Sequence, residues 1–309
     1  MAFDFAAVMA PFRMQPGLRR LEPGTPQLTP NRPGDPALEQ KLEVLERHAD
    51  EAFVAVPSFD AGPALAAIVA RAAAEHPQAF DVDDDGRVTA RRLGWSWRAG
   101  RIEGDGRGDI GACLAALPAP WRLAGLLGLA CAEDLAVIDA QGRIPWIAVC
   151  LPSSWAPADK VGRHFAEVHA PVADNRTLLA AADHLARLVT AGERWERFVW
   201  TITDDPRLAR HPRHSAAPRW DSWPTPQALA AAAYLRAERQ TFLPVAGMGQ
   251  AVFTIRVTVE PLQDAVASRA DAERLHAALA SMSPAVLAYR QLAPARERLL
   301  AWLAQAMAP

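Results

Sequence analysis

The segment from Ala148 to Val172 holds the residue best placed to bind a ligand or a metal, His169. A strand-like run ends in a Leu-Pro-Ser-Ser-Trp motif, an amphipathic stretch follows, and His169 stands directly before Ala-Pro. Because Pro171 must end a helix, the imidazole lies where the chain leaves that helix. A neutral imidazole in such a place can coordinate a metal ion, although a single histidine is more often structural.

The other histidines give a weaker signal. His164 lies five positions before His169, and that spacing does not place two ligands on one helix face. Four further histidines stand alone on predicted helices, and we expect them to be structural: His48, His76, His184 and His276. His211 and His214 belong to an Arg-His-Pro-Arg-His segment that can simply be a basic surface loop.

Charged and polar side chains alternate along two predicted strands. In the strand over 234–244, Arg236, Glu238 and Gln240 lie on one face, and in the strand over 250–260 Arg256 shares its face with small residues. Antiparallel sheets commonly expose one face to water, so this row can be solvated. Alternatively the charges point into a ligand cavity, where charge-assisted hydrogen bonds are strong. The pattern by itself permits both interpretations.

Several kinds of site are excluded by their missing motifs. The chain has no G-x-S-x-G, Walker, Rossmann or HExxH motif. Residues 81–86 resemble the start of a calcium loop, but Arg92 stands where the closing acid belongs, so we expect a turn between two short strands. The three cysteines form no CxxC pair, which predicts buried reduced thiols rather than a zinc site or disulfides: Cys113, Cys131 and Cys150.

Composition limits the class of protein. The chain has 309 residues, half of them hydrophobic, which is enough for a large core. With 33 Lys and Arg against 35 Asp and Glu, the net charge of -2 provides no electrostatic footprint for nucleic acid. The N-terminal segment carries Asp4, lacks a basic region, and has too short an apolar run for a signal peptide or membrane span. We therefore expect a cytoplasmic protein without nucleic-acid or membrane partners.

The order of predicted elements indicates an α+β fold. Glycines and prolines make residues 1–36 an irregular arm, and helical periods follow at 36–56 and 62–76. Strand patterns, the first two forming a hairpin, occupy 134–139, 144–151, 197–203, 234–244 and 250–260. After the last strand the chain is helical to its end.

Two helices, over 157–169 and 175–190, fall between the second and third strands, and an insertion rich in Pro, Arg, His and Trp spans 205–226. An antiparallel five-stranded sheet with helices at that point has the order of a PAS-like fold. We expect one compact unit with three parts. They are an N-terminal arm with helices at 1–80, a PAS-like core at 81–262 and a C-terminal helical extension at 263–309.

Six short motifs occur in a fixed order along the chain. They are FRM at Phe12–Met14, CLPSSW at Cys150–Trp155, KVGR at Lys160–Arg163, VHAPV at Val168–Val172, RAERQT at Arg236–Thr241 and FTIR at Phe253–Arg256. Together they resemble the haem-dependent oxidative N-demethylase family, from near the N-terminus to about residue 262. The combination is much more specific than any one of the motifs.

The resemblance implies a PAS-like haem-binding core that works as an enzyme. In that family a haem subunit oxidises a methyl group of a secondary amine such as dimethylamine, with O2 activated at the haem iron, and releases formaldehyde. Electrons would come from NADPH through a separate flavin and iron–sulfur reductase subunit, and further subunits would handle the formaldehyde. This sequence has no pattern for flavin, iron–sulfur cluster or nicotinamide, so it is similar to the haem subunit alone.

The resemblance also implies roles for two histidines and two acids. His169 becomes the leading candidate for the axial iron ligand, with His164 as the alternative. A dimethylammonium ion needs a carboxylate that binds it and accepts its proton. We expect Glu238 in that role, with Asp204 as the second choice.

Three arginines are candidates for pairing with the haem propionates or polarising dioxygen: Arg236, Arg239 and Arg256. Alternation along each strand suggests that Arg236 and Arg256 share a face more readily than Arg239 does.

The chain departs from the family pattern in two places. Trp200 and Thr201 stand where a more polar pair is expected, and the Arg-His-Pro-Arg-His segment has no counterpart that we can place. Either departure can alter the substrate pocket. The alternative functions are a haem-binding PAS-like sensor or carrier without catalysis, and a scaffold subunit that has lost haem. The enzyme is favoured because no output domain such as a kinase follows the core.

Overall fold

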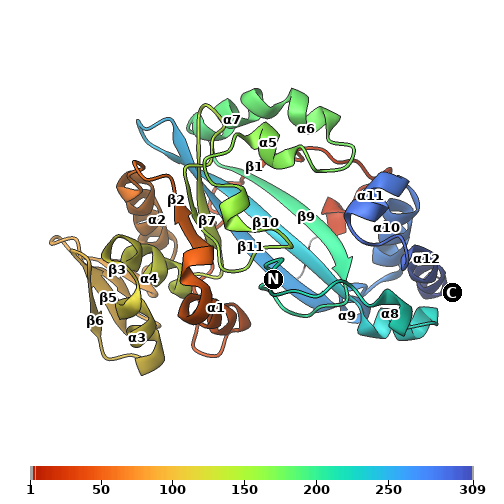
Figure 1. Ribbon diagram of the computed structural model, residues 1–309, viewed down its shortest axis with the longest axis horizontal. Coiled ribbons are helices and arrows are strands. Elements are labelled where there is room, and N and C mark those ends of the chain that lie inside the picture. The colour runs from red at the N-terminus through yellow and green to blue at the C-terminus, as the bar shows by residue number, and fades with distance from the viewer. Residues whose placement is uncertain (1–2, 4, 308–309) are drawn as a thin grey trace.

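The chain folds around an antiparallel sheet of seven strands in the order β1-β9-β10-β11-β7-β8-β2 (Figure 1). The computed structural model describes residue 3 and residues 5–307. The strands of this sheet are β1 (Arg19–Arg20), β2 (Phe53–Ala55), β7 (Asp134–Asp139), β8 (Trp146–Ala148), β9 (Trp195–Thr203), β10 (Tyr234–Val245) and β11 (Gln250–Pro261). A second sheet contains β3 (Phe80–Val82), β4 (Val88–Ala90), β5 (Trp95–Arg98) and β6 (Arg101–Gly104).

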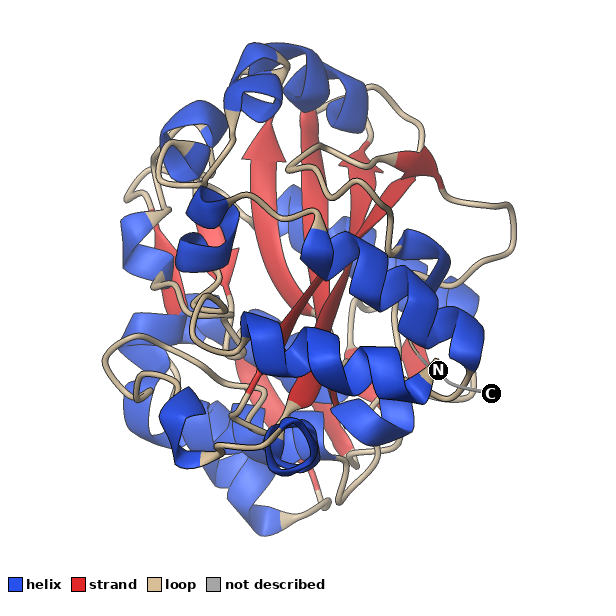
Figure 2. Cartoon of the chain, turned by 90° about the vertical axis from the view of Figure 1, so that its right-hand side faces the viewer, coloured by secondary structure: helices blue, strands red, loops and turns tan. Residues whose placement is uncertain are grey.

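Helices surround the long strands. They are α1 (Pro36–Ala52), α2 (Gly62–Glu75), α3 (Gly108–Ala116), α4 (Arg122–Ala130), α5 (Phe165–His169), α6 (Arg176–Ala180), α7 (Ala182–Thr190), α8 (Pro226–Ala232), α9 (Leu262–Ala265), α10 (Arg269–Ala280), α11 (Pro284–Tyr289) and α12 (Arg296–Ala306). In Figure 1, α1–α4 and the small sheet lie on one side of β9–β11, α8–α12 lie on the other, and α5–α7 lie along the top. Figure 2 shows helices in front of the strands near both termini.

All five expected strands are present, as the contiguous part β9-β10-β11-β7-β8 of the main sheet. The sheet is larger than expected because β1 pairs with β9 and β2 pairs with β8. These edge strands have two and three residues, too few to show the alternation by which a strand is recognised in sequence. The expected arm over 1–36 therefore contributes an edge strand, while its residues 1, 2 and 4 lie outside the described part.

The turn expected at residues 81–86 is confirmed. β3 pairs with β4 in a hairpin, and the Asp83 carboxylate accepts hydrogen bonds from the backbone amides of Asp85 at 3.0 Å and Arg87 at 2.8 Å. The acid that suggested a calcium ligand thus stabilises the turn itself.

The expectation of one helix over 157–169 is wrong. Pro157–Asp159 is a short 3-10 helix, and Gly162, with φ at +76°, turns the chain before α5 begins. α5 has a capping box: His164 Nδ1 accepts a hydrogen bond from a backbone amide, and Glu167 Oε2 accepts one from the His164 amide at 2.7 Å. Likewise the helix expected over 175–190 is divided into α6 and α7 at Ala181. The C-terminal helices expected after 262 are present.

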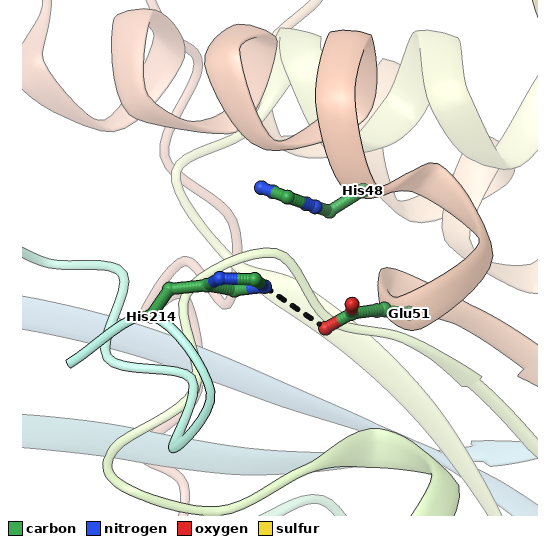
Figure 3. A group of neighbouring side chains, drawn as sticks. All are labelled: His48, Glu51 and His214. Atoms are coloured by element: carbon green, nitrogen blue, oxygen red, sulfur yellow. Dashed lines mark hydrogen bonds and ion pairs between the residues drawn. The ribbon is translucent and has the colours of Figure 1, made fainter.

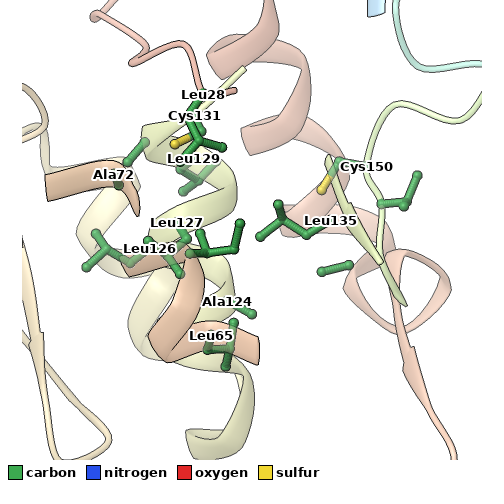
Figure 4. Packing of buried hydrophobic residues seen from close by; sticks show 14 of the residues in the cluster. Leu28, Leu65, Ala72, Ala124, Leu126, Leu127, Leu129, Cys131, Leu135 and Cys150 are labelled. Atoms are coloured by element: carbon green, nitrogen blue, oxygen red, sulfur yellow. The ribbon is translucent and has the colours of Figure 1, made fainter. Parts of the chain in front are cut away.

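The largest apolar core lies between α1, α2, α4 and the β7–β8 hairpin. Figure 4 shows Leu126, Leu127 and Leu129 of α4 in one cluster with Leu65 of α2 and Leu135 of β7. The prediction of buried reduced thiols is confirmed, since all three cysteines are free and buried in this core. Among the described residues, every helix is too short or too polar to cross a lipid bilayer.

We expect alkaline pH to destabilise the fold through these thiols. Burial raises the pKa of Cys113 to about 11, whereas an unfolded thiol titrates near about 8.5. The buried thiol thus contributes stability that is present below the unfolded pKa and is lost as pH rises toward 11, by up to about 3 kcal/mol. Urea unfolding at pH 8 and pH 10.5 should show a smaller decrease in Cys113→Ala than in wild type. Equal decreases would contradict this role for Cys113.

A buried ion pair connects α1 to the sheet. Lys41 Nζ lies 3.1 Å from Asp134 Oδ1, and both side chains are at most 1% exposed. The ammonium group also donates to the backbone carbonyls of residues 128, 131 and 133 at 3.1, 3.1 and 2.6 Å. Asp134 Oδ2 accepts from the Leu151 amide at 2.7 Å, so the same carboxylate holds the start of the segment that leads to His169.

We expect Lys41→Met to lower the free energy of unfolding by about 3–5 kcal/mol, because it leaves the Asp134 carboxylate buried without its cation. Chemical denaturation measures this change. Arg47→Met is the matched control on α1, since the Arg47–Glu43 pair is 65% and 58% exposed and such pairs contribute about 1 kcal/mol or less. Similar losses in both variants would refute the prediction.

Candidate functional site

The strand register places the charged residues on two opposite faces of the sheet. Residues that stand opposite each other in an antiparallel pair share a face. Arg239 stands opposite Arg256, whereas Arg236 stands opposite Val259. The expectation that Arg236 and Arg256 share a face is therefore wrong: Arg256 shares its face with Arg239. Alternation within each strand could not show this, because the register depends on the Gly247–Gly249 turn that joins β10 to β11.

We call the opposite surface the Glu238 face. It consists of Arg236, Glu238 and Gln240 of β10, Arg197, Val199 and Thr201 of β9, and Ile255 and Val257 of β11. The prediction that Arg236, Glu238 and Gln240 lie together is thus confirmed.

The Glu238 carboxylate is held at both oxygens. The Ser153 hydroxyl donates to Oε1, and Gln240 Nε2 donates to Oε2 at 2.6 Å. Arg236 Nε in turn donates to Ser153 Oγ at 2.8 Å. Ser153 belongs to the CLPSSW motif, so this motif and the RAERQT motif form one polar network. The network fixes a carboxylate, which suits the binding of a small cation.

Arg236 is occupied by the protein itself. It is 2% exposed and donates to the carbonyl oxygens of residues 152, 207 and 208 at 3.4, 3.0 and 2.7 Å. Burial lowers the pKa of this guanidinium to about 10, and the charge of Glu238 opposes that shift. Arg236 therefore anchors the segment after β9 and has few donors left for a ligand.

Arg239 and Arg256 lie away from the Glu238 face. Arg239 Nε pairs with Glu196 Oε2 at 3.0 Å, and its NH1 donates to the Pro26 carbonyl at 2.8 Å. Burial raises the pKa of Glu133, and the positive charge of Arg256 partly opposes this shift. Arg239 is thus held by protein partners on the other side of the sheet, and Arg256 lies on that side with it.

His169 lies at the end of α5 in a half-buried position. Its Nδ1 donates to the Phe165 carbonyl at 2.8 Å, and its ring centroid is 4.0 Å from that of Phe165. Burial lowers the pKa of His169 to about 4. The hydrogen bond to Phe165 raises this pKa by a smaller amount, and the charge of Arg197 lowers it further. The ring is neutral at neutral pH and its Nε2 carries the lone pair. This orientation by a backbone carbonyl is typical of metal-binding histidines.

His164 has both ring nitrogens engaged. Nδ1 accepts from the Ala166 amide at 3.1 Å, and Nε2 lies 3.3 Å from Asp183 Oδ1. A Cβ at Gly142, whose φ is +78°, would approach His164 Nε2 to 2.6 Å, so this glycine makes room for the ring. His164 thus caps α5, and of the two candidate ligands His169 has the more available nitrogen.

Asp204, the second candidate acid, lies just beyond β9. Its Oδ2 accepts a hydrogen bond from the Arg219 amide at 2.6 Å, within the 205–226 insertion. In the part of the chain that the structure describes, no hydrogen bond or ion pair joins Asp204 to Glu238.

Arg197 and Thr201 were not predicted as site residues. Arg197 Nε and Thr201 Oγ1 are buried without a hydrogen-bond partner in the described part of the chain, and both lie on the Glu238 face. Burial lowers the pKa of Arg197, and Glu238 opposes this shift. The sequence contained the signal, since Arg197, Val199 and Thr201 alternate along the third expected strand. Of the unusual Trp200–Thr201 pair, only Thr201 faces this site, because Trp200 stands opposite Ala237.

The FRM motif holds the arm against α11. The Arg290 guanidinium lies 4.7 Å from the Phe12 ring centroid and 3.9 Å from Met14 Sδ. It also donates to the Trp200 carbonyl. Next to it, burial raises the pKa of Tyr289, and the charge of Glu238 acts in the same direction. The motif thus anchors Arg290, the residue that follows α11, between the arm and β9, a contact that the sequence did not predict.

One protein-family model matches this chain over most of its length. The family model described as haem-dependent oxidative N-demethylase, alpha subunit-like, matches residues 36–300, which cover most of the chain and all the residues named above except those of the arm. The chain belongs to the haem-dependent oxidative N-demethylase alpha subunit-like family.

Proposed function

We propose that this chain is the haem subunit of an enzyme that oxidatively demethylates a small secondary amine such as dimethylamine. The family supports a haem-dependent oxidative enzyme. The observation that carries the proposal is a neutral histidine, oriented through Nδ1, beside a sheet face that holds a fixed carboxylate. The charge of Arg197 lowers the pKa of His169, and the charge of Glu238 acts on Arg197, so Arg197 connects the two residues in this proposal.

The residues present fit a haem. His169 would hold the iron through Nε2, and Arg197 Nε and Thr201 Oγ1, buried without a partner among the described residues, would meet a polar group of the haem. Bound haem would supply the iron at which dioxygen oxidises the methyl group. In this proposal β9-β10-β11-β7-β8 with α5–α7 is a PAS-like cradle within 81–262. The parts 1–80 and 263–309 cover it, and the three form one compact unit.

Glu238 is the proposed partner of the amine. A dimethylammonium ion binds the ionised carboxylate, and Oε2 accepts its proton before oxidation of the methyl group. Ser153 and Gln240 hold the two oxygens and so orient the carboxylate. Asp204 remains the second choice, although it is bonded within the insertion.

Arg197 is the cation that we propose for pairing with a haem carboxylate, in place of the three arginines expected from sequence. Arg197→Gln should weaken haem binding by about 10- to 100-fold, since a hydrogen bond to a charged group contributes about 1.5–3 kcal/mol. Haemin titration followed by absorption measures the change. Arg239→Gln, on the other face, is the control and should leave haem affinity unaltered. The reverse outcome would return the role to Arg239.

The family also suggests how electrons reach the haem. The name alpha subunit-like supports an assembly of several subunits. We propose that electrons come from NADPH through a separate flavin and iron–sulfur reductase subunit, in the cytoplasm. The net reaction combines one dimethylamine, one O2, two electrons and two protons to give methylamine, formaldehyde and water.

The test is an absorption spectrum of the purified protein with and without haemin, followed by turnover. A Soret band is expected on reconstitution, and formaldehyde and methylamine should then form in equal amounts from dimethylamine, oxygen and a chemical reductant. A Soret band without formaldehyde from any small methylated amine would favour the haem sensor or carrier. Failure to bind haem would refute both functions.

A further inference from the structure

A second group of metal-binding side chains lies outside the Glu238 face, between α1 and the 205–226 insertion. His214 Nε2 lies 3.1 Å from Glu51 Oε2, and His211 Nδ1 lies 3.3 Å from the same oxygen. His48, Glu51 and His214 each offer one potential ligand atom, and these three atoms lie within 4.8 Å of one another. Figure 3 shows the His48 and His214 rings and the Glu51 carboxylate gathered from these two segments.

Local backbone geometry builds this group. The backbone of His48 departs from helical geometry inside α1, with φ at -143° and ψ at 32°. In the insertion, the His214 amide donates to the His211 carbonyl at 2.9 Å, and the turn brings both rings toward Glu51. The rings of His48 and His214 stack with their centroids 4.0 Å apart. Two segments distant in sequence thus bring nitrogen and oxygen donors within 4.8 Å of one another.

A cavity of about 490 Å³ adjoins this group, and His48, Glu51, His211 and His214 all contribute to its wall. The side chains of the four residues are partly buried or only moderately exposed. An ion held there would therefore be sheltered by protein on one side and accessible from the cavity on the other.

We propose that His48, Glu51 and His214 bind a divalent transition-metal ion, and that this ion is Zn²⁺. Imidazole nitrogen and carboxylate oxygen are ligands that Zn²⁺ accepts, whereas Mg²⁺ and Ca²⁺ prefer oxygen ligands alone. Three protein ligands leave a position for water on the side of the cavity. His211 is a positioning residue, because it contacts the Glu51 oxygen that also meets His214.

The ion would tie the insertion to α1. Directly before His211, the Arg210 amide donates to the Pro152 carbonyl and its carbonyl accepts from the Ser154 amide, both at 2.9 Å. The same stretch carries the carbonyls of residues 207 and 208 that accept from Arg236. The metal therefore stabilises the segment that holds Arg236 and Ser153. Metal binding itself does not depend on haem. Only the idea that the metal affects catalysis, through Arg236 and Ser153, rests on the proposed function.

The experiment uses untagged, haem-free, metal-depleted full chain titrated with Zn²⁺ in a calorimeter, with Mg²⁺ for comparison. Wild type should bind one Zn²⁺ and no Mg²⁺. His48→Asn and His214→Asn should each weaken binding by more than about 100-fold, and His211→Asn by about 10- to 100-fold, as for the loss of a residue that orients a ligand. His184→Asn, an exposed histidine of α7, is the matched control and should bind as wild type does.

Hydrogen exchange supplies a second readout on the wild-type chain. Zn²⁺ should slow exchange of the amides in 207–214, and it should have no such effect in His214→Asn. Should the His48 variant fail to fold, Glu51→Gln and His214→Asn test the same ligands. Absence of one-to-one Zn²⁺ binding in wild type, or unchanged affinity in the ligand variants, would overturn the proposal. Because all samples are haem-free, this result is independent of whether the chain demethylates amines.

Discussion

The His169→Ala variant should lose its Soret band when reconstituted with haemin, through a decrease in haem affinity of at least about 100-fold. The variant removes the imidazole whose Nδ1 is held by Phe165 and whose Nε2 we propose as the iron ligand. Absorption of the reconstituted, desalted protein and its haem content per chain measure the effect. In His169→Gly, added imidazole should restore the band, because a small ligand can enter the space left by the ring.

The control is His164→Asn. Asparagine caps helices well, so this change keeps the start of α5 while removing the alternative ligand. Its Soret band should equal that of wild type. A retained band in His169→Ala together with loss in His164→Asn would assign the ligand to His164, and loss in neither would remove both histidines from the iron site.

Glu238→Gln should decrease formaldehyde formation by about 10²- to 10⁴-fold while haem content stays unchanged. The amide keeps the shape of the side chain and can still meet Ser153 and Gln240, but it cannot accept the proton of the ammonium group. The turnover number and the Soret absorbance, measured on the same sample, separate chemistry from cofactor loss.

Asp204→Asn is the matched acid-to-amide control, because its carboxylate is bonded to the Arg219 amide in the insertion. We expect its turnover to remain near wild type. Full activity in Glu238→Gln would exclude Glu238 as the proton acceptor. If the loss appeared in Asp204→Asn instead, the second choice made from the sequence would be the correct acid.

Part of the candidate site could be predicted from the sequence because it depends on local geometry. Alternation along β10 places Arg236, Glu238 and Gln240 on one face, and the contacts through Ser153 bear this out. The five expected strands also follow from local pattern: four of them have six or more residues, and the three residues of β8 lie within the apolar run 144–151. The prediction of one helix over 157–169 was wrong for a local reason, because the chain turns at Gly162.

The remaining features depend on which segments meet. The register of β10 against β11 pairs Arg239 with Arg256, a fact that neither strand contains alone. The short edge strands β1 and β2 form because β9 and β8 offer them hydrogen bonds. Arg236 donates to the carbonyls of residues 207 and 208 in the insertion. These hydrogen bonds leave it few donors for the ligand that the sequence predicted.

The amino-acid sequence by itself determined the α+β class, the main strands, the buried thiols, and the family, because periodicity, residue type and ordered motifs are properties of the linear chain. Only the tertiary structure decided which charges share a face and that Glu51 meets His214 across 163 residues. Such contacts depend on the closing of long loops and on the packing of whole elements, and no local preference of the residues involved records them.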